Sequence, residues 1–444
     1  MRATNDDITL VVAWTRQFDD AGNPLKPRLP LGVTYLLGAL HRAGYRASVR
    51  DIQHANGSPL PALLDALEYS APVVGVSCMN DLLPAVLVAV SDHKRDHPGK
   101  TVILGGPGPT GVAEELLSAF RAVDIIVKGE GEQTLVDLLD CLREDADLAK
   151  VAGIVYQNDG RPRVNAAQPR LQNLDNLHPL PFNVFELHRY HATLPVSTSR
   201  GCPYNCAFCD IVGLWGRSTT FRSLDSVLAE LNDMTHFGVT NVTFVDDTFV
   251  LERSRVEAFC QRMRDEQLGH TWHCNGRINL MDERLLSRMV SGGCRSVFYG
   301  IESGSDRILT RINKAFSAEQ AERTVRLTAR YVQTRVSFIW GFPFETFDDF
   351  KATWALAHRL AVIRNVTAQL FLLAPLPNTL IHGEYGAAVV FDPALRSDLS
   401  GCDVLSAEEL DLIRDHPTVF ASFYTYPTVR LSDKLRWLMR NPLP

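Results

Sequence analysis

The sequence predicts an α/β protein with two domains in tandem, a doubly wound Rossmann-like domain followed by a partial (β/α)6 barrel of the TIM type. Two observations lead to this prediction. Short apolar runs alternate with helical patterns through most of the chain. Turn-forming residues interrupt this alternation between residues 151 and 190. With 444 residues, of which 45% are hydrophobic and 22% charged, the chain is long enough for a substantial buried core.

Residues 1–150 have the pattern of the doubly wound domain. Five apolar runs are expected to form its strands: 8–14, 45–51, 72–78, 100–106 and 123–129. Helical patterns such as 32–44 and 110–120 lie between them, so the strands should run parallel. Ligands of such sheets bind beyond the carboxyl ends of the strands, where the glycine-rich turns 105–111 and 129–132 fall.

Residues 151–190 are expected to form a β-hairpin and a proline-containing linker. A second series of strands and helices fills residues 191–375, with strands expected at 194–199, 241–247, 271–277, 296–302, 335–341 and 367–373. Six such units make a partial barrel, whose active site lies at the carboxyl ends of the strands. Residues 376–444 form a C-terminal extension of unknown role, and its lone Cys402 cannot hold a metal cluster by itself.

Charge and hydropathy exclude several classes of partner. The net charge is −6 and the basic residues are scattered, so we expect no nucleic-acid partner and no anionic membrane surface. No stretch reaches the roughly 18 apolar residues of a membrane span, and the N-terminus lacks the features of a secretory signal. We therefore expect a cytoplasmic protein with reduced cysteines and a small-molecule or peptide substrate.

Three of the nine cysteines, Cys202, Cys206 and Cys209, fall within eight residues of one another, after the first strand of the second series. A closed structural zinc site needs four Cys or His ligands, and no partner pair accompanies these three. Three thiolates on a [4Fe–4S] cluster would leave one iron open to a substrate or cofactor. A zinc-bearing interaction module remains the alternative. The other cysteines of the barrel are interpreted as small core residues: Cys260, Cys274 and Cys294.

This cysteine loop, with Phe208 just before the third cysteine, resembles the signature loop of the radical S-adenosylmethionine (SAM) superfamily, and the predicted barrel agrees with that resemblance. The resemblance implies that the three cysteines hold a [4Fe–4S] cluster whose open iron binds SAM. Cleavage of SAM would then give a 5′-deoxyadenosyl radical that abstracts a hydrogen atom. An external electron donor such as flavodoxin or ferredoxin is implied as well.

The same resemblance implies contacts with SAM at the ends of the following strands. The residues and their implied partners are Asp246 or Asp247 for the methionine ammonium, Arg277 for its carboxylate, Glu302 and Ser303 for the ribose and the methionine part, and Gly341 for the adenine. A carboxylate is a natural partner for a cation, and a guanidinium can pair with a carboxylate through two hydrogen bonds.

The first domain resembles the cobalamin-binding domain of cobalamin-dependent radical SAM enzymes in the order and spacing of segments 30–51, 75–79, 105–111 and 123–135. Glycines let the backbone approach a large cofactor, and helix N-termini favour its phosphate. The residues implied in cobalamin binding are Ser77, Gly105, Gly106, Gly108, Gly129 and Glu130. The methylthiotransferase pattern is excluded, because it needs three cysteines in the first domain and only Cys78 and Cys141 occur there.

No residue of the sequence is expected to bind the lower face of the cobalt ion. Asp51, His54 and Gly57 almost match a DxHxxG motif, but the spacing is one residue too long, so His54 is interpreted as a surface loop residue. Gly108 stands where the family often has histidine. Methyl transfer would then use the upper face of cobalt, toward the barrel.

These features together predict a cobalamin-dependent radical SAM methyltransferase that acts on an unactivated carbon or phosphorus centre, in natural-product or pigment biosynthesis. The alternative is an enzyme with the same cofactors that rearranges, cyclises or oxidises its substrate without methyl transfer.

Overall fold

The computed structural model describes residues 5–15, 25–55, 58–395, 397 and 405–443, so Gly57 and Cys402 lie outside the described residues. The chain forms two compact units. Unit 1 takes residues 1–172, 176–191 and 399–424, and unit 2 takes residues 173–175, 192–398 and 425–444, each as far as it is described. None of the helices in the described part of the chain is long and apolar enough to cross a membrane.

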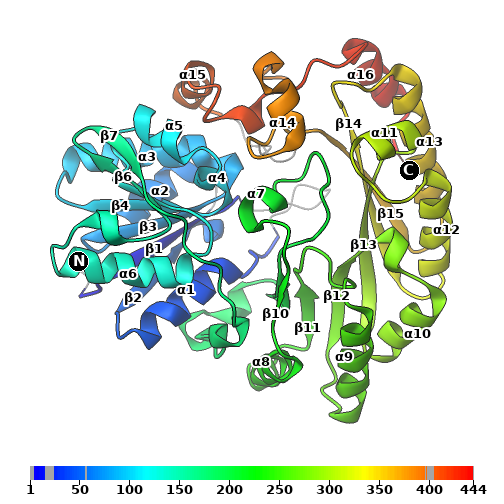
Figure 1. Ribbon diagram of the computed structural model, residues 1–444, viewed down its shortest axis with the longest axis horizontal. Helices are drawn as coiled ribbons and strands as arrows, with labels where there is room; N and C mark the ends of the chain where they lie inside the picture. The colour runs from blue at the N-terminus through cyan, green and yellow to red at the C-terminus, as the bar shows by residue number, and fades with distance from the viewer. Residues whose placement is uncertain (1–4, 16–24, 56–57, 396, 398–404, 444) are drawn as a thin grey trace. The chain divides into compact units, whose positions relative to one another are not determined.

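Unit 1 is built on a seven-stranded sheet with the strand order β2-β1-β3-β4-β5-β6-β7 (Figure 1). β1 to β5 are parallel, and β6 and β7 form an antiparallel hairpin that continues the sheet beyond β5. The strands are β1 Ile8–Ala13, β2 Ala47–Asp51, β3 Val73–Cys78, β4 Thr101–Gly105, β5 Ile125–Val127, β6 Ile154–Asn158 and β7 Arg161–Val164. The sequence located β1 to β5 within two residues. Most residues of β1, β3, β4 and β5 are buried and apolar, as expected for parallel strands, whereas the edge strand β2 is only partly buried.

Helices cover both faces of this sheet, since every residue of β1 is buried. In α6, Leu135, Leu138 and Leu139 follow the spacing of an amphipathic helix and share one core with Leu10 and Ile125 of the sheet. The helices of unit 1 are α1 Leu31–Arg42, α2 Pro59–Glu68, α3 Leu83–Asp96, α4 Pro107–Thr110, α5 Ala113–Ala119, α6 Gly131–Arg143 and α15 Ala407–Asp415. The doubly wound fold is therefore confirmed for this half of the chain.

Unit 2 contains a six-stranded sheet in which all neighbouring strands are parallel, in the order β15-β14-β13-β12-β11-β8 (Figure 1). The strands are β8 Thr193–Val196, β11 Asn241–Phe244, β12 Thr271–Gly276, β13 Cys294–Glu302, β14 Gln333–Trp340 and β15 Val366–Leu372. Strand order follows chain order from one edge to the other, as in a barrel that stays open. The partial barrel is thus confirmed, with all six strands close to the predicted ranges.

At least one helix lies between each strand of this sheet and the next strand along the chain. The helices of unit 2 are α7 Ile211–Trp215, α8 Leu224–His236, α9 Arg253–Asp265, α10 Glu283–Ser291, α11 Asp306–Arg311, α12 Ala318–Thr328, α13 Phe347–Ala361, α14 Leu380–Tyr385 and α16 Leu431–Arg440. The three barrel cysteines that the sequence assigned to the core are buried as expected: Cys260, Cys274 and Cys294.

Candidate functional site

The cysteine loop lies beyond the carboxyl end of β8. A short antiparallel ribbon closes it, in which β9 (Ser199–Arg200) pairs with β10 (Thr220–Phe221). Cys202, Cys206 and Cys209 are half-buried and form no disulfide. Burial raises the pKa of the Cys209 thiol to about 12, so a thiolate at this position needs a bound cation to stabilise it.

The three thiols are not gathered as tightly as the ligands of a single tetrahedral ion. Among the described residues, only one group of three His, Cys, Asp or Glu side chains has its ligand atoms within 4.8 Å of one another, and it lies elsewhere in the chain. Thiolates about 2.3 Å from one tetrahedral ion would lie closer together than that limit. Not all three sulfur atoms therefore lie within 4.8 Å of one another in the structure.

Backbone hydrogen bonds from distant segments hold the cysteine loop in place. Ala207 N donates to Ile312 O at 3.1 Å, and Ile381 N donates to Ala207 O at 3.0 Å. The side-chain amide of Asn313 donates to Asn205 O at 2.9 Å. Segments that follow α11 and begin α14 thus fix a loop that lies more than 100 residues earlier in the chain.

Arg277, at the end of β12, stacks on the cysteine loop. Its guanidinium carbon lies 3.4 Å from the centre of the Tyr204 ring, which is within cation–π contact. The residue is buried, and no described residue accepts a hydrogen bond from its Nε or Nη2 atom. These two atoms form one edge of the guanidinium, the edge that pairs with a carboxylate through two parallel hydrogen bonds. An anionic group beside the cysteine loop would satisfy both.

The two aspartates after β11 point to different partners. The Asp246 carboxylate is buried and accepts hydrogen bonds from Thr198 N, Thr198 Oγ1 and Ser199 Oγ at 2.6, 2.5 and 2.9 Å. Burial raises the pKa of Asp246, although these hydrogen bonds act in the opposite direction. Asp247 is half-buried and accepts from Gly201 N at 3.0 Å, next to the first cysteine of the loop. Asp246 thus organises the backbone, and Asp247 lies against the cysteine loop.

Glu302 ends β13 in the left-handed backbone region, with a φ of 73°. Such a conformation is uncommon for a residue other than glycine and is often found at functional sites. Its carboxylate pairs with Lys314 Nζ at 3.1 Å, and both side chains are less than 10% exposed. Lys314 Nζ also lies 5.5 Å from the centre of the Phe208 ring. Ser303 is fully buried, and its hydroxyl bonds to that of Thr353 at 2.8 Å.

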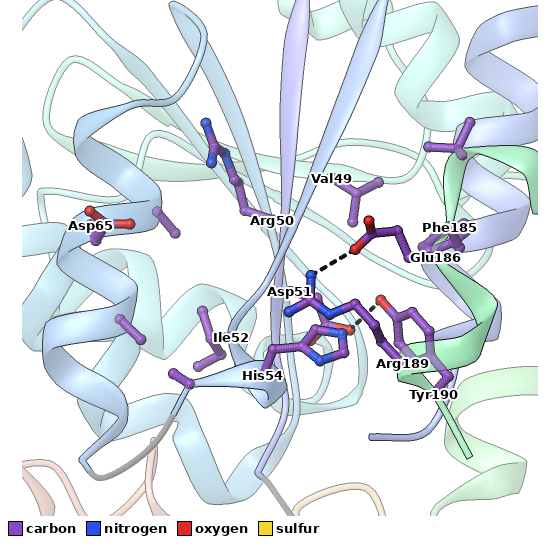
Figure 2. Close-up of a pocket in the computed structure, with 14 residues that line it drawn as sticks. Val49, Arg50, Asp51, Ile52, His54, Asp65, Phe185, Glu186, Arg189 and Tyr190 are labelled. Atoms are coloured by element: carbon purple, nitrogen blue, oxygen red, sulfur yellow. Dashed lines mark hydrogen bonds and ion pairs between the residues drawn. The ribbon is translucent and has the colours of Figure 1, made fainter. Parts of the chain in front are cut away.

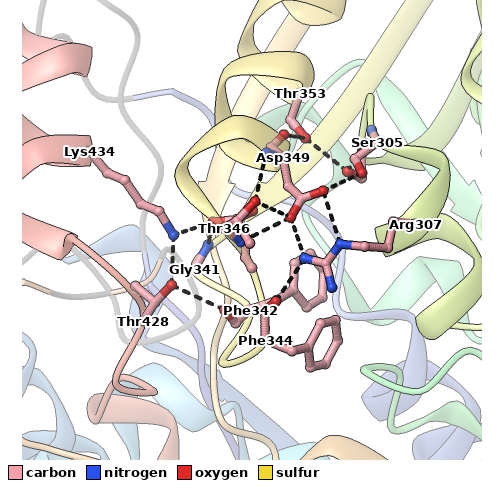
Figure 3. Close-up of polar contacts among 12 residues, drawn as sticks. Ser305, Arg307, Gly341, Phe342, Phe344, Thr346, Asp349, Thr353, Thr428 and Lys434 are labelled. Atoms are coloured by element: carbon pink, nitrogen blue, oxygen red, sulfur yellow. Dashed lines mark hydrogen bonds and ion pairs between the residues drawn. The ribbon is translucent and has the colours of Figure 1, made fainter.

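Gly341 belongs to a turn held by a buried ion pair (Figure 3). Its φ is +90°, and its N–H donates to Glu345 Oε2 at 3.0 Å. The same oxygen accepts from Lys434 Nζ in α16 at 2.7 Å, and both side chains are 0% exposed. Lys434 also donates to Thr428 Oγ1, which donates in turn to Phe342 O. The end of the C-terminal extension therefore fixes the turn after β14, a role that the sequence did not indicate.

In unit 1, the candidate cobalamin residues of β3 and β4 lie at the carboxyl end of the sheet. Ser77 is paired with Gly105 in register near the carboxyl ends of both strands. A Cβ atom at Gly106 would lie 2.9 Å from Cys78 O, and Gly106 has a φ of +93°. A Cβ at Gly108 would lie 3.0 Å from the same oxygen. These two glycines let the turn after β4 pack directly against the end of β3, and a side chain would push it away.

The other two candidate cobalamin residues, Gly129 and Glu130, follow β5. Gly129 has a φ of +77°, with nothing within 4 Å of an added Cβ atom. Glu130 is buried, and its carboxylate accepts a hydrogen bond from Leu171 N at 2.6 Å, so it ties the linker to unit 1.

His54 is half-buried in a turn just after β2, with its ring edge-on to Tyr190 at a centroid distance of 4.9 Å (Figure 2). It lines a pocket of about 440 Å³ with Asp51, which accepts a hydrogen bond from the Tyr190 hydroxyl.

Comparison with known proteins agrees with this architecture. Residues 27–139 match the family model of the B12 binding domain, and residues 196–357 match that of the radical SAM superfamily. An uncharacterized methyltransferase of Pyrococcus horikoshii is 28% identical, over 91% of this chain and 89% of its own length. The anaerobic magnesium-protoporphyrin IX monomethyl ester cyclase of Rubrivivax gelatinosus is 25% identical, over 92% of this chain and 77% of its own length.

A solved structure shares the fold of the whole chain. The radical SAM methyltransferase TsrM of Kitasatospora setae, solved with cobalamin and a [4Fe–4S] cluster bound, has a TM-score of 0.76 and 18% identity, and the match covers 98% of this chain and 91% of that chain. The chain described here carries a B12-binding domain followed by a radical SAM domain, and it is a cobalamin-dependent radical SAM enzyme. Its cofactors are a [4Fe–4S] cluster, SAM and cobalamin, which confirms the cofactors expected from the sequence.

Proposed function

We propose that this enzyme is a methyltransferase that acts on an unactivated carbon or phosphorus centre of a small-molecule substrate. Two kinds of support favour methyl transfer: the pairing of a B12-binding domain with a radical SAM domain, and the relatives of similar length whose names are those of methyltransferases. When bound, the cluster and SAM supply radical hydrogen abstraction, and cobalamin supplies a methyl group.

The observation that carries the SAM-binding part of the proposal is the edge of Arg277 that has no hydrogen-bond partner among the described residues. A buried guanidinium with two unsatisfied donors is costly, and it is placed over the cysteine loop by its stacking on Tyr204. We infer that this edge receives the carboxylate of SAM. We further infer that Asp247, rather than Asp246, meets the ammonium group, because Thr198 and Ser199 already donate to the Asp246 carboxylate.

A binding experiment tests this assignment. Substitution of Arg277 by Gln in the reconstituted holoenzyme removes a charge-assisted pair, and we expect the Kd for SAM to rise about ten- to a hundredfold. The matched control is Arg284→Gln, an exposed arginine in α10 of the same unit, which should leave the Kd unchanged. Equal SAM affinities in Arg277→Gln and the wild type would remove Arg277 from the site.

Product analysis tests methyl transfer itself. The holoenzyme is incubated anaerobically with substrate, a reductant and methyl-labelled SAM, and S-adenosylhomocysteine and 5′-deoxyadenosine are quantified. A methyltransferase of this kind is expected to form both from SAM, near parity during turnover. Formation of 5′-deoxyadenosine alone would contradict methyl transfer. It would instead favour cyclisation or another rearrangement, the alternative supported by the similarity to the cyclase of Rubrivivax gelatinosus.

A further inference from the structure

Unit 1 contains a compact group of metal-ligating side chains away from the candidate cofactor residues. Glu68, His93 and His97 each offer one ligand atom, and these three atoms lie within 4.8 Å of one another. Among the described residues, this is the only group of three His, Cys, Asp or Glu side chains that are so close. Glu68 is the last residue of α2. His93 lies in the last turn of α3, and His97 follows one helical turn later as its C-cap residue. The spacing of four places both imidazoles on one face of the helix end.

The burial of His93 is evidence for a ligand that is independent of the spacing of the three side chains. The residue is only 4% exposed, and no described residue forms a hydrogen bond with its buried Nε2 atom. A buried polar atom without a partner is destabilising, so such an atom is rare unless water or an ion satisfies it. Burial lowers the pKa of His93 to about 4, and Lys100 and His97 add to this effect. A neutral imidazole nitrogen donates its lone pair to a metal, and the buried Nε2 atom of His93 is such a donor.

The other two side chains are already oriented toward each other. His97 Nε2 lies 2.9 Å from Glu68 Oε2, and the rings of His93 and His97 have a centroid distance of 4.6 Å. All three line a surface pocket of about 310 Å³, into which Asp65, Asp92 and Asp96 also face.

The charge around this pocket favours a cation. Its lining carries four carboxylates, those of Glu68 and of the three aspartates. Lys100 Nζ donates to the carbonyl oxygens of Leu67 and Ser70, and Arg95 pairs with one of these four carboxylates, that of Asp92, at 2.9 Å, so it offsets one of the four negative charges.

We propose that Glu68, His93 and His97 form a binding site for a divalent transition metal ion, and that Zn²⁺ is the ion that suits it best. Two imidazoles and one carboxylate are typical donors for Zn²⁺, with water as a fourth ligand. Two atoms about 2.1 Å from one ion are at most about 4.2 Å apart, so small side-chain rotations close the site around it.

The site lies at the amino-terminal end of the strands, because α3 ends just before β4 begins. The candidate cobalamin residues lie at the opposite end, where β3 and β4 finish. The ion therefore joins the C-terminal ends of α2 and α3 and has a structural role, separate from the radical chemistry.

Zinc K-edge X-ray absorption tests the site in the intact holoprotein, because the edge is specific for zinc and ignores the iron of the cluster. With one equivalent of Zn²⁺ added, we expect only nitrogen and oxygen neighbours at about 2.0–2.1 Å, with the outer-shell signal of imidazole. Sulfur neighbours at about 2.3 Å would place the ion in the cysteine loop and overturn the proposal.

Competition with a chromophoric chelator then assigns the ligands. We expect His97→Ala and Glu68→Gln each to weaken Zn²⁺ binding at least tenfold. The control is His41→Ala, an exposed histidine of α1 in the same unit, and it should bind Zn²⁺ like the wild type. His97 and Glu68 both reach the surface, so these variants are expected to fold, and retained cobalamin and iron contents check this. An unchanged affinity in either variant would overturn the assignment.

Discussion

Replacement of Lys434 by Met tests whether the C-terminal helix holds the turn after β14. The substitution leaves the Glu345 carboxylate, which is 0% exposed, without its counter-charge. Burial already raises the pKa of Glu345, and Lys434 is the largest influence that lowers it. In the variant the carboxyl must therefore stay ionised and unpaired, or take up a proton.

The cost of that proton sets the magnitude. A carboxyl with an ordinary pKa of about 4.3 costs about 1.4 kcal/mol per pH unit to keep protonated, which is about 3.7 kcal/mol at pH 7 and about 1 kcal/mol at pH 5. In the folded variant the pKa of Glu345 is raised above its unfolded value, so the folded state binds this proton more tightly. The variant therefore keeps most of its stability below about pH 4.3 and loses stability as the pH rises toward the folded pKa. We therefore expect Lys434→Met to lose about 3–5 kcal/mol at pH 7 and about 1–2 kcal/mol at pH 5.

Urea unfolding of the full chain, followed by tryptophan fluorescence, measures this loss. Five of the six tryptophans, all except Trp14, lie in unit 2. The control is Lys351→Met, which breaks an ion pair at the surface of α13 and should cost less than about 1 kcal/mol at both pH values. The double variant Glu345→Gln with Lys434→Met should recover much of the stability and lose the pH dependence. A loss that is equally large at pH 5 and pH 7 would refute this reasoning.

Two further outcomes follow from the site geometry. Gly106→Ala is expected to lower the free energy of unfolding by about 1–3 kcal/mol, because the added Cβ would meet Cys78 O at 2.9 Å. The variant should also retain less cobalamin per chain after gel filtration. The control Gly99→Ala, whose added Cβ has nothing within 4 Å, should retain cobalamin like the wild type. Although burial alone would raise the pKa of Asp349, hydrogen bonds from Arg307, Ser305 and Thr346 hold it below its ordinary value. Asp349→Asn should therefore destabilise unit 2 by about 1–3 kcal/mol at pH 7, and the difference from the wild type in urea unfolding should shrink as the pH falls below about 4.

Much of the fold could be predicted from the sequence, because parallel strands covered on both faces are continuous apolar runs. Every residue of β1 is buried, and it was found from its apolar run alone. Strand ends were also predictable: Ser77 and Gly105 lie near the carboxyl ends of β3 and β4 in the first sheet, and Arg277 follows β12 in the second sheet. The hairpin 154–164 was predicted from its turn residues, whereas its place in the first sheet was not, since pairing with β5 depends on long-range contacts.

The candidate site was only partly predictable, because its second layer comes from distant segments. Lys314 and Tyr204 have no motif of their own, and their positions beside Glu302 and Arg277 depend on the folded barrel. The different hydrogen-bond partners of Asp246 and Asp247 also needed the structure, because they come from the neighbouring cysteine loop and from the end of β8. His93 and His97 do show a signal, a spacing of four at a helix end, but Glu68 joins them only through the packing of α2 against α3.

The anchoring of the cysteine loop explains how a site built from remote segments can still be preorganised. Two of its anchors, from Ala207 N to Ile312 O and from Ile381 N to Ala207 O, join backbone atoms and do not depend on side-chain identity. They fix the path of the loop through backbone atoms alone, which would reduce the chain entropy that the loop loses on binding a cluster. The segment that provides the first anchor also carries Lys314, which pairs with Glu302. One short segment therefore holds both the cluster loop and the end of β13, which couples the position of the thiols to that of a candidate SAM ligand.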